Sequence, residues 1–216
     1  MSRKHVSTLI GKAPGEMAVR RRSRCMTMQK LRQAGLEVFS RYGFDGASTK
    51  MVAQRAGINE ALISRYFGGK AGLLDAIILE YAREVQNESS AYATGRTLEE
   101  ELSNFLTAGI SAAMGHPTFL KLVLSRALLH AKFRKTITRH LHGAGEAPLM
   151  DRLREYQKQK MIDRSVDLQE TVDILRLFVA GTLLHQFAMS DPVIKTKRAI
   201  DWISKAIAIA LRSESL

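Results

Sequence analysis

Glycine interrupts an otherwise helical sequence at short intervals in the first third of the chain. The interrupting residues are Gly43, Gly46, Gly57, Gly68 and Gly69. Because glycine adopts the left-handed conformation that ends helices, this spacing predicts two short helices, at about 50–56 and 60–67. Ser48 and Asn59 precede these helices and are good N-cap residues. Two short helices joined by a tight turn are typical of a helix-turn-helix, which places its second helix in the major groove of DNA.

Hydrophobic residues recur at three- and four-residue spacing along most of the remaining chain, which indicates further helices and no strands. The expected helices lie at about 27–43, 70–91, 97–114, 118–129, 131–142, 148–161, 167–189 and 194–212. Residues 1–25 lack this period, and we expect them to form a flexible basic arm. The sequence therefore predicts an all-α protein with an N-terminal three-helix helix-turn-helix domain at 26–72 and a larger C-terminal helical bundle at 73–216.

Positive charge is concentrated in the first third of the chain. The net charge is +12, and residues 1–72 hold 14 Lys and Arg against four Asp and Glu. This asymmetry is typical of a polyanion-binding part joined to a near-neutral part, although a solubilising basic tail would also produce it. The single cysteine, Cys25, excludes an internal disulfide and a four-cysteine zinc site. Because no apolar run suits a signal peptide or a membrane span, we expect a cytoplasmic protein. No residue spacing indicates a metal or a cofactor, and we expect neither.

Residues 27–75 resemble the DNA-binding domain of the TetR family of bacterial transcriptional repressors. The matching pattern is Leu31-x-x-Ala34-Gly35-x-x-Val38-Phe39-x-x-x-Gly43-Phe44 followed by Ser48-Thr49-x-x-Val52-Ala53-x-x-Ala56-Gly57-Ile58-Asn59-x-Ala61-x-Ile63-x-x-Tyr66-Phe67-x-x-Lys70-x-x-Leu73. The resemblance implies an all-helical homodimer with an operator-binding N-terminal domain and a ligand-sensing C-terminal bundle. The chain departs from the family at Ser64, where Tyr is usual, and at Asn59, where Ser is usual and caps equally well.

The resemblance also implies which residues contact DNA. The expected set is Ser48, Thr49, Lys50, Glu60, Ala61, Leu62, Ser64, Arg65, Tyr66 and Lys70. In it, Lys50, Ser64, Tyr66 and Lys70 are expected to contact phosphates. Arg65 suits bidentate recognition of guanine, unless it is only a phosphate clamp. Glu60 could accept from a cytosine amino group, or could be a first-turn acid favoured by the helix dipole.

Ala61 or Leu62 could meet a thymine methyl group. The arginines of the basic arm either enter a minor groove or attract DNA without specificity.

The helices expected at about 167–189 and 194–212 each carry an apolar stripe, and the second is apolar on more than one face, which indicates more than one packing neighbour. The resemblance places a dimer interface of four helices there. The expected interface residues are Ile174, Phe178, Gly181, Leu184, Ile203, Ile207 and Ala210. An ordinary monomer core would give a similar pattern. A dimer would set the spacing of two DNA-reading helices, which must lie about one turn of DNA apart.

A small-molecule site is expected inside the bundle, between about residues 98 and 188. The candidate pocket residues are Phe105, Met114, Phe119, Leu122, Arg126, His130, Phe133 and His185. Such pockets are mostly apolar with a few polar anchors. Arg126 and His130 lie one helical turn apart and could bind an anion together, or could be surface or core groups. The six histidines show no metal-binding spacing.

Taken together, these patterns predict a ligand-responsive, sequence-specific DNA-binding regulator, most simply a repressor released by a small molecule. Its partners would be double-stranded operator DNA, a second copy of the chain and a small-molecule effector, and no membrane. The helix beginning at Lys70 would transmit the signal. An activator would use the same DNA-binding chemistry. No nucleophile elbow, P-loop or dinucleotide-binding glycine pattern indicates an enzyme. The alternative is a sequence-independent, nucleoid-type DNA-binding protein.

Overall fold

The computed structural model describes residues 14–129, 133, 135, 137, 146–188 and 196–212. Its helices are α1 Pro14–Gly46, α2 Thr49–Ala56, α3 Ala61–Phe67, α4 Lys70–Ser90, α5 Leu98–Gly115, α6 Pro117–Leu129, α8 Ala147–Lys158, α9 Leu168–Ala188 and α10 Thr196–Ala210. The described residues contain helices and no strand, which confirms the all-α prediction. Most of the helix expected at 131–142 lies outside the described residues. No described helix is both long enough and apolar enough to cross a membrane.

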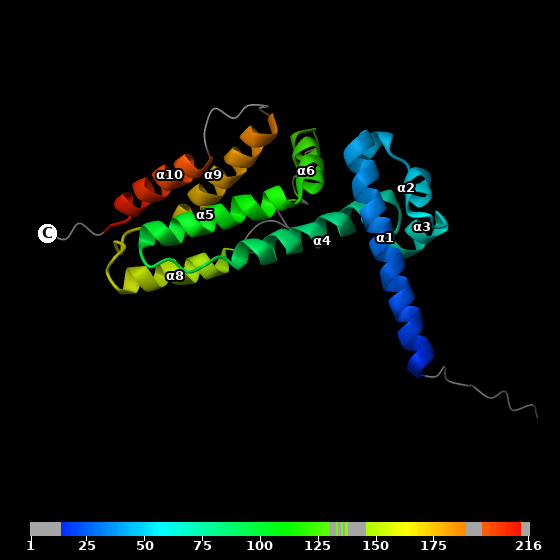
Figure 1. Ribbon diagram of the computed structural model, residues 1–216, viewed down its shortest axis with the longest axis horizontal. Coiled ribbons are helices and arrows are strands. Elements are labelled where there is room, and N and C mark those ends of the chain that lie inside the picture. Colours follow the sequence, from blue (N-terminus) through cyan, green and yellow to red (C-terminus); the bar gives the residue numbers. More distant parts are fainter. Residues whose placement is uncertain are drawn as a thin grey trace, which may run out of the picture.

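The helices are arranged along one long axis. Figure 1 shows α1, α2 and α3 at one end, α5, α8, α9 and α10 towards the other, and α4 running between them. The C-terminal end of α10 lies far from α3 (Figure 1). The two ends of the molecule are therefore joined through α4, with α6 packed beside α1.

Helix α1 is longer than the sequence pattern predicted. It begins at Pro14, so residues 14–25 of the expected flexible arm are helical, while residues 1–13 lie outside the described residues. Proline is favoured at the first position of a helix, and residues 16–34 contain no glycine or proline to end it. This correction has a physical reason: a helix exposed on all sides needs no hydrophobic period. The predicted break at Gly43 is confirmed, with φ 70° and ψ 162° inside α1.

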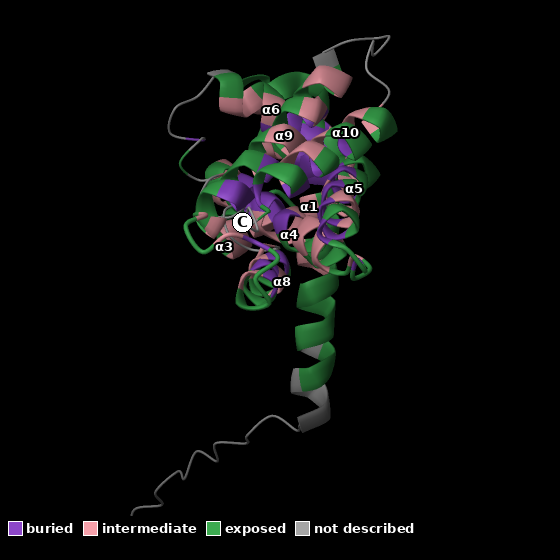
Figure 2. Cartoon of the chain, turned by 90° about the vertical axis from the view of Figure 1, so that its left-hand side faces the viewer, coloured by how far each residue is buried: buried purple, intermediate pink, exposed green. Residues whose placement is uncertain are grey.

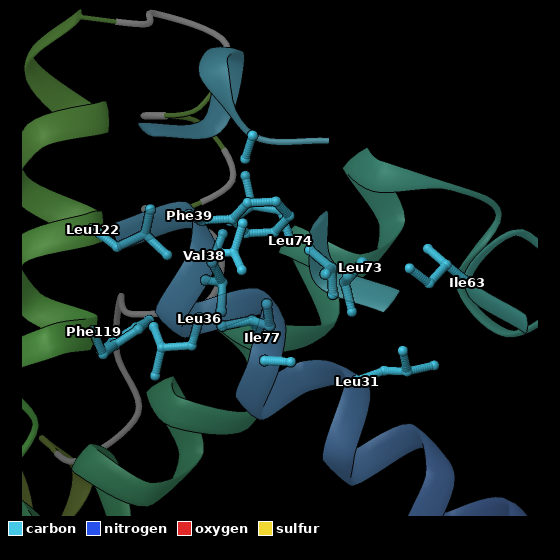
Figure 3. Close-up of a cluster of buried hydrophobic side chains, with 14 of the residues drawn as sticks. Leu31, Leu36, Val38, Phe39, Ile63, Leu73, Leu74, Ile77, Phe119 and Leu122 are labelled. Carbon is cyan, nitrogen blue, oxygen red and sulfur yellow. The ribbon is translucent and has the colours of Figure 1, made fainter. Parts of the chain in front are cut away.

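The first hydrophobic core joins α1, α2 and α3 to α4 and α6. Leu31 of α1, Ile63 of α3 and Ile77 of α4 are fully buried in it (Figure 3). Phe119 and Leu122 of α6 pack into the same cluster (Figure 3). This core extends beyond the domain boundary predicted at residue 72, so the first part of α4 is packed as a component of the N-terminal end.

Polar contacts also join α1 to α4. Arg32 donates to both carboxylate oxygens of Glu80, at 2.5 and 2.7 Å, and both side chains are largely shielded from solvent. The Tyr81 hydroxyl donates to Gln33 at 3.0 Å. Gly35 allows the close approach, because a Cβ there would lie 2.8 Å from Ile77 Cδ1. A movement of the first half of α4 must therefore carry α1 with it.

The second core is formed by α5, α8, α9 and α10. Leu102 and Leu106 of α5, Leu149 and Leu153 of α8, and Leu175 of α9 are fully buried in it. Helix α5 contacts α4, α8, α9 and α10, so it forms the centre of this end of the molecule.

A carboxylate is buried beside the second core. Glu101 has no exposed surface, and it accepts hydrogen bonds from the Tyr92 hydroxyl at 2.7 Å and from the Gly95 backbone N–H at 2.8 Å. Arg152 of α8 lies 3.6 Å from the same carboxylate. Burial and the hydrogen bond to Glu101 raise the pKa of Tyr92 above its ordinary value. The Glu101 carboxylate thus joins the loop between α4 and α5 to helices α5 and α8.

Candidate DNA-binding interface

Helices α2 and α3 form the predicted helix-turn-helix. Ser48 Oγ accepts a hydrogen bond from the Met51 backbone N–H at 3.2 Å and caps α2. Gly57 ends α2 in the left-handed conformation, with φ 64° and ψ 36°. Asn59 Oδ1 accepts from the N–H of Ala61, the first residue of α3, at 2.9 Å, although the N-cap position itself is held by Glu60. Side-chain hydrogen bonds and one glycine therefore set the tight turn between the two helices.

The outward face of α3 centres on Arg65. Ile63 is fully buried and attaches α3 to the first core, while Ala61, Ser64 and Arg65 are exposed on the other side. Leu62 is half-buried against the first core, which leaves little of its surface for a thymine methyl group. The exposed face of α3 that could contact bases therefore includes Ala61, Ser64 and Arg65 and little of Leu62.

Two of the predicted DNA-contact residues bind each other. The Thr49 hydroxyl donates to Glu60 Oε1 at 2.6 Å and links the start of α2 to the start of α3. One carboxylate oxygen of Glu60 is therefore engaged within the protein. This geometry favours a role for Glu60 in positioning the two helices over the predicted contact with a cytosine amino group.

Lysines lie at the starts of the helices that flank α3. Lys50 is exposed in the first turn of α2. Lys70 opens α4, where its Nζ lies 4.5 Å from the centroid of the Phe44 ring and donates to the Asp45 carbonyl at 3.4 Å. Lys50 and Lys70 thus belong to the first turns of the helices that precede and follow α3 in the sequence, and their predicted contacts with phosphates remain a prediction.

Arg24 of α1 lies next to the end of α3. Its guanidinium carbon is 5.2 Å from the centroid of the Tyr66 ring, a distance typical of a cation–π contact. Sequence reasoning missed this neighbour because it assigned Arg24 to a flexible arm. A signal was present, however: Arg24 precedes the buried Leu31 by seven residues, which is two turns along one helix face.

A cavity of about 230 Å³ lies among α4, α5, α6 and α9. Phe105 and Phe119 line it, as predicted for a pocket. Residues of α4 and α9 also line it that sequence reasoning missed, namely Val85, Gln86, Ser89, Arg176, Val179, Ala180 and Leu183. Glu146 and Arg176 form an ion pair at 3.0 Å in the wall, which gives a mostly apolar cavity one polar side.

The predicted anion site at Arg126 is not part of this cavity. The guanidinium carbon of Arg126 lies 4.0 Å from the Phe44 ring centroid, and its Nη1 lies 3.3 Å from Asp45 Oδ2. His130 lies outside the described residues. Arg126 therefore joins α6 to the end of α1, which corrects its assignment to the pocket.

Four more predicted pocket residues lie elsewhere. Leu122 and Phe133 pack in the first core and are not among the residues that line the cavity. Met114 is exposed at the end of α5. His185 lines a separate cavity between α9 and α10. The periodicity of apolar residues identifies the buried side of a helix. The packing of the neighbouring helices decides which of the buried residues line a cavity.

Exposed apolar side chains are frequent on α9 and α10. They are Ile174, Leu177, Leu184, Phe187, Trp202 and Ile209. The predicted interface residues that lie on exposed surface are Ile174, Gly181, Leu184 and Ala210. The predicted residues that pack against the second core instead are Phe178, Ile203 and Ile207. Large apolar groups left in water in this number mark a surface for a partner.

Comparison with known proteins agrees with this geometry. Residues 31–77 match the bacterial regulatory proteins, tetR family. Over 67 residues the chain is 39% identical to the HTH-type transcriptional regulator BetI of Vibrio vulnificus, covering 31% of this chain and 32% of BetI. Over 62 residues it is 36% identical to the HTH-type transcriptional regulatory protein RaaS of Mycobacterium tuberculosis, covering 29% of each protein. The match thus spans about a third of the length of either relative.

Solved structures share the fold over most of the chain. The fatty acid degradation regulator FadR from Bacillus halodurans has a TM-score of 0.66 at 16% identity, covering 95% of this chain and 100% of that one. A TetR family transcription regulator from Marinobacter aquaeolei has a TM-score of 0.60 at 14% identity, covering 88% of this chain and 98% of that one. The arrangement of a helix-turn-helix and a helical bundle is therefore common to all three.

Proposed function

We propose that this chain, which belongs to the tetR family of bacterial regulatory proteins, is a sequence-specific DNA-binding regulator of transcription that responds to a small molecule. It acts as a cytoplasmic, homodimeric repressor that an effector releases from its operator, through binding and not through catalysis. The observation that carries the proposal is the exposed face of α3 at Arg65, with Lys50 in the first turn of α2 and Lys70 in the first turn of α4. Base-edge readers between phosphate contacts are what sequence-specific binding requires.

The second half of the molecule favours a regulator over a nucleoid-type DNA-binding protein. A protein that only packages DNA has no use for a separate helical bundle with its own core. Here that bundle contains a cavity of about 230 Å³, which is enough for a small apolar ligand with one polar group.

Helix α6 connects this cavity to the DNA-binding end. Phe119 and Val123 line the cavity and also belong to the first core. One turn further along the helix, Arg126 holds the end of α1 through Phe44 and Asp45. Sequence reasoning named α4 alone as the lever, and the contacts of α6 add a second one. An effector that prefers another packing of α4 and α6 would shift α3, with a coupling of about 1–3 kcal/mol.

Selection of duplexes by the purified full-length protein tests the proposal. Sequence-specific binding predicts enrichment of a palindromic site, whose affinity should exceed that for random duplex by about a thousandfold or more. Enrichment of no sequence, with equal affinity for every duplex, would instead identify a sequence-independent binder. Titrating both duplexes over a range of salt separates phosphate attraction from base reading.

The exposed face of α9 predicts how the dimer can be broken. Leu177 is 72% exposed in the single chain, so Leu177→Glu should leave the subunit folded. If two copies pair through this face, burying an unpaired carboxylate should convert the dimer to a monomer. Analytical ultracentrifugation and circular dichroism measure both properties.

The matched control places the same charge on a surface outside the proposed interface. Ser111→Glu on the exposed side of α5 should leave the dimer intact. A Leu177→Glu protein that sediments as the wild type does would show that this face is not the interface.

A further inference from the structure

The N-terminal turns of α1 project from the body of the protein. Figures 1 and 2 show this part of α1 continuing past α3 without another helix packed against it. Leu31 is fully buried, but residues 21–26 are exposed. We call residues 18–30 the α1 extension. A helix that makes so little contact with its own chain contributes little to the core, so its sequence is free to serve another purpose.

The charged residues of the α1 extension are all cations. Arg21, Arg22, Arg24 and Lys30 are exposed. The sequence contains no Asp or Glu between residues 17 and 36. Arg21 and Arg22 make no ion pair with any residue that the structure describes, so their charges are not neutralised there. Such a surface fits a polyanion and does not fit an apolar or basic partner.

The α1 extension contacts the last turn of α3, beside Arg65 in the sequence. Arg24 lies over the ring of Tyr66, in the last turn of α3. Arg21 precedes Arg24 by three residues, so it lies on the same side of α1, one turn further from the body. A duplex that lies against α3 and continues in the direction of the projecting helix would meet Arg21 next.

We propose that the α1 extension is a second DNA-contacting surface, which binds phosphates of the duplex just outside the sequence read by α3. The inference rests on the proposed function, because it takes the bound duplex as its partner. Guanidinium groups bind phosphate oxygens without reading bases. The extension therefore adds affinity and salt dependence, and it lengthens the duplex that the protein covers, without changing the sequence that is selected.

Duplex length and a double substitution test the inference together. The probes are a duplex selected by the wild-type protein and trimmed to its enriched core, and the same core with one helical turn of random sequence added on each side. The wild type should bind the longer probe about tenfold more tightly at low salt. In the Arg21→Gln, Arg22→Gln protein this preference should disappear, and the slope of log affinity against log salt should become shallower by about 2–4 on the longer probe.

Glutamine is a suitable replacement because its helix propensity is close to that of arginine, so the extension should stay helical. The matched control is Arg154→Gln with Lys158→Gln on α8, two exposed cations that belong to no DNA-facing surface. This control should keep both the length preference and the salt slope of the wild type.

Three outcomes would overturn the inference. The first is a double variant that keeps the wild-type length preference. The second is a wild type that binds the trimmed and the longer probe equally well. The third is a double variant that loses binding to anionic phospholipid vesicles but keeps its DNA behaviour, which would assign the extension to a membrane surface.

Different experimental results would refute the proposed function and the inference about the α1 extension. If the wild type enriches no sequence at all, sequence-specific regulation is wrong. A length preference on random duplexes that disappears in the double variant would still identify the α1 extension as a DNA-binding surface.

Discussion

Replacing Arg65 by alanine should weaken operator binding by about 2–6 kcal/mol, or roughly 30-fold to 10⁴-fold, because a dimer would lose one bidentate guanine contact in each half-site. The side chain is exposed on α3 and makes no ion pair with any described residue, so its removal should not change the melting temperature. Fluorescence anisotropy with operator and random duplexes measures the effect. Operator affinity should fall, while affinity for random duplex should change little.

Lys70→Ala provides the comparison for a phosphate contact. It should lower the affinity for both duplexes by a similar factor, and the salt slope should become shallower by about two units for a dimer. If Arg65→Ala behaves in this way as well, Arg65 is a phosphate clamp and the sequence is read elsewhere on α3.

Removal of the buried Glu101 carboxylate should destabilise the protein by about 3–5 kcal/mol, because two donors would be left buried without an acceptor. These donors are the Tyr92 hydroxyl and the Gly95 N–H. For a chain of this size, Glu101→Ala should lower the melting temperature by about 6–20 °C. Glu99→Ala, two residues earlier on the exposed side of α5, is the control and should cost less than about 1 kcal/mol.

The pH dependence of this contact has a definite sign. Because the pKa of Tyr92 is raised above 10.0 in the folded protein, the stabilisation is fully present below pH 10 and declines only at more alkaline pH. The difference in melting temperature between wild type and Glu101→Ala should therefore be constant from pH 7 to about pH 9. Equal melting temperatures for Glu101→Ala and Glu99→Ala would show that the buried carboxylate does not stabilise the fold.

The positions of the helices could be predicted because local signals set them. Gly57 and the cap at Ser48 act through bonds to neighbours no more than a few residues away, and the structure confirms both. Asn59 bonds the Ala61 N–H as a local signal would, but the N-cap of α3 is Glu60, one residue later than predicted. The start of α1 could not be predicted in the same way. A helix surrounded by solvent has no apolar face, so residues 14–25 gave no hydrophobic period to detect.

The candidate pocket was only partly predictable, because contacts between distant parts of the chain decide it. Arg126 carries the charge of a ligand anchor, yet it pairs with Asp45, 81 residues away in the sequence. Phe105 and Phe119 were identified because aromatic residues on the buried side of a helix often border a cavity. Nothing in the local sequence of α4 indicates that Val85 meets the same cavity.

Phe119 and Val123 belong both to the cavity wall and to the first core, and this constrains how the protein can evolve. Each side chain borders the cavity proposed for the effector and also packs among residues that support α3. A mutation there that accommodates a new effector would disturb operator recognition in the same step. Ala180 of α9 borders the cavity without belonging to either core, so the preference for an effector could diverge there without disturbing the packing that supports α3.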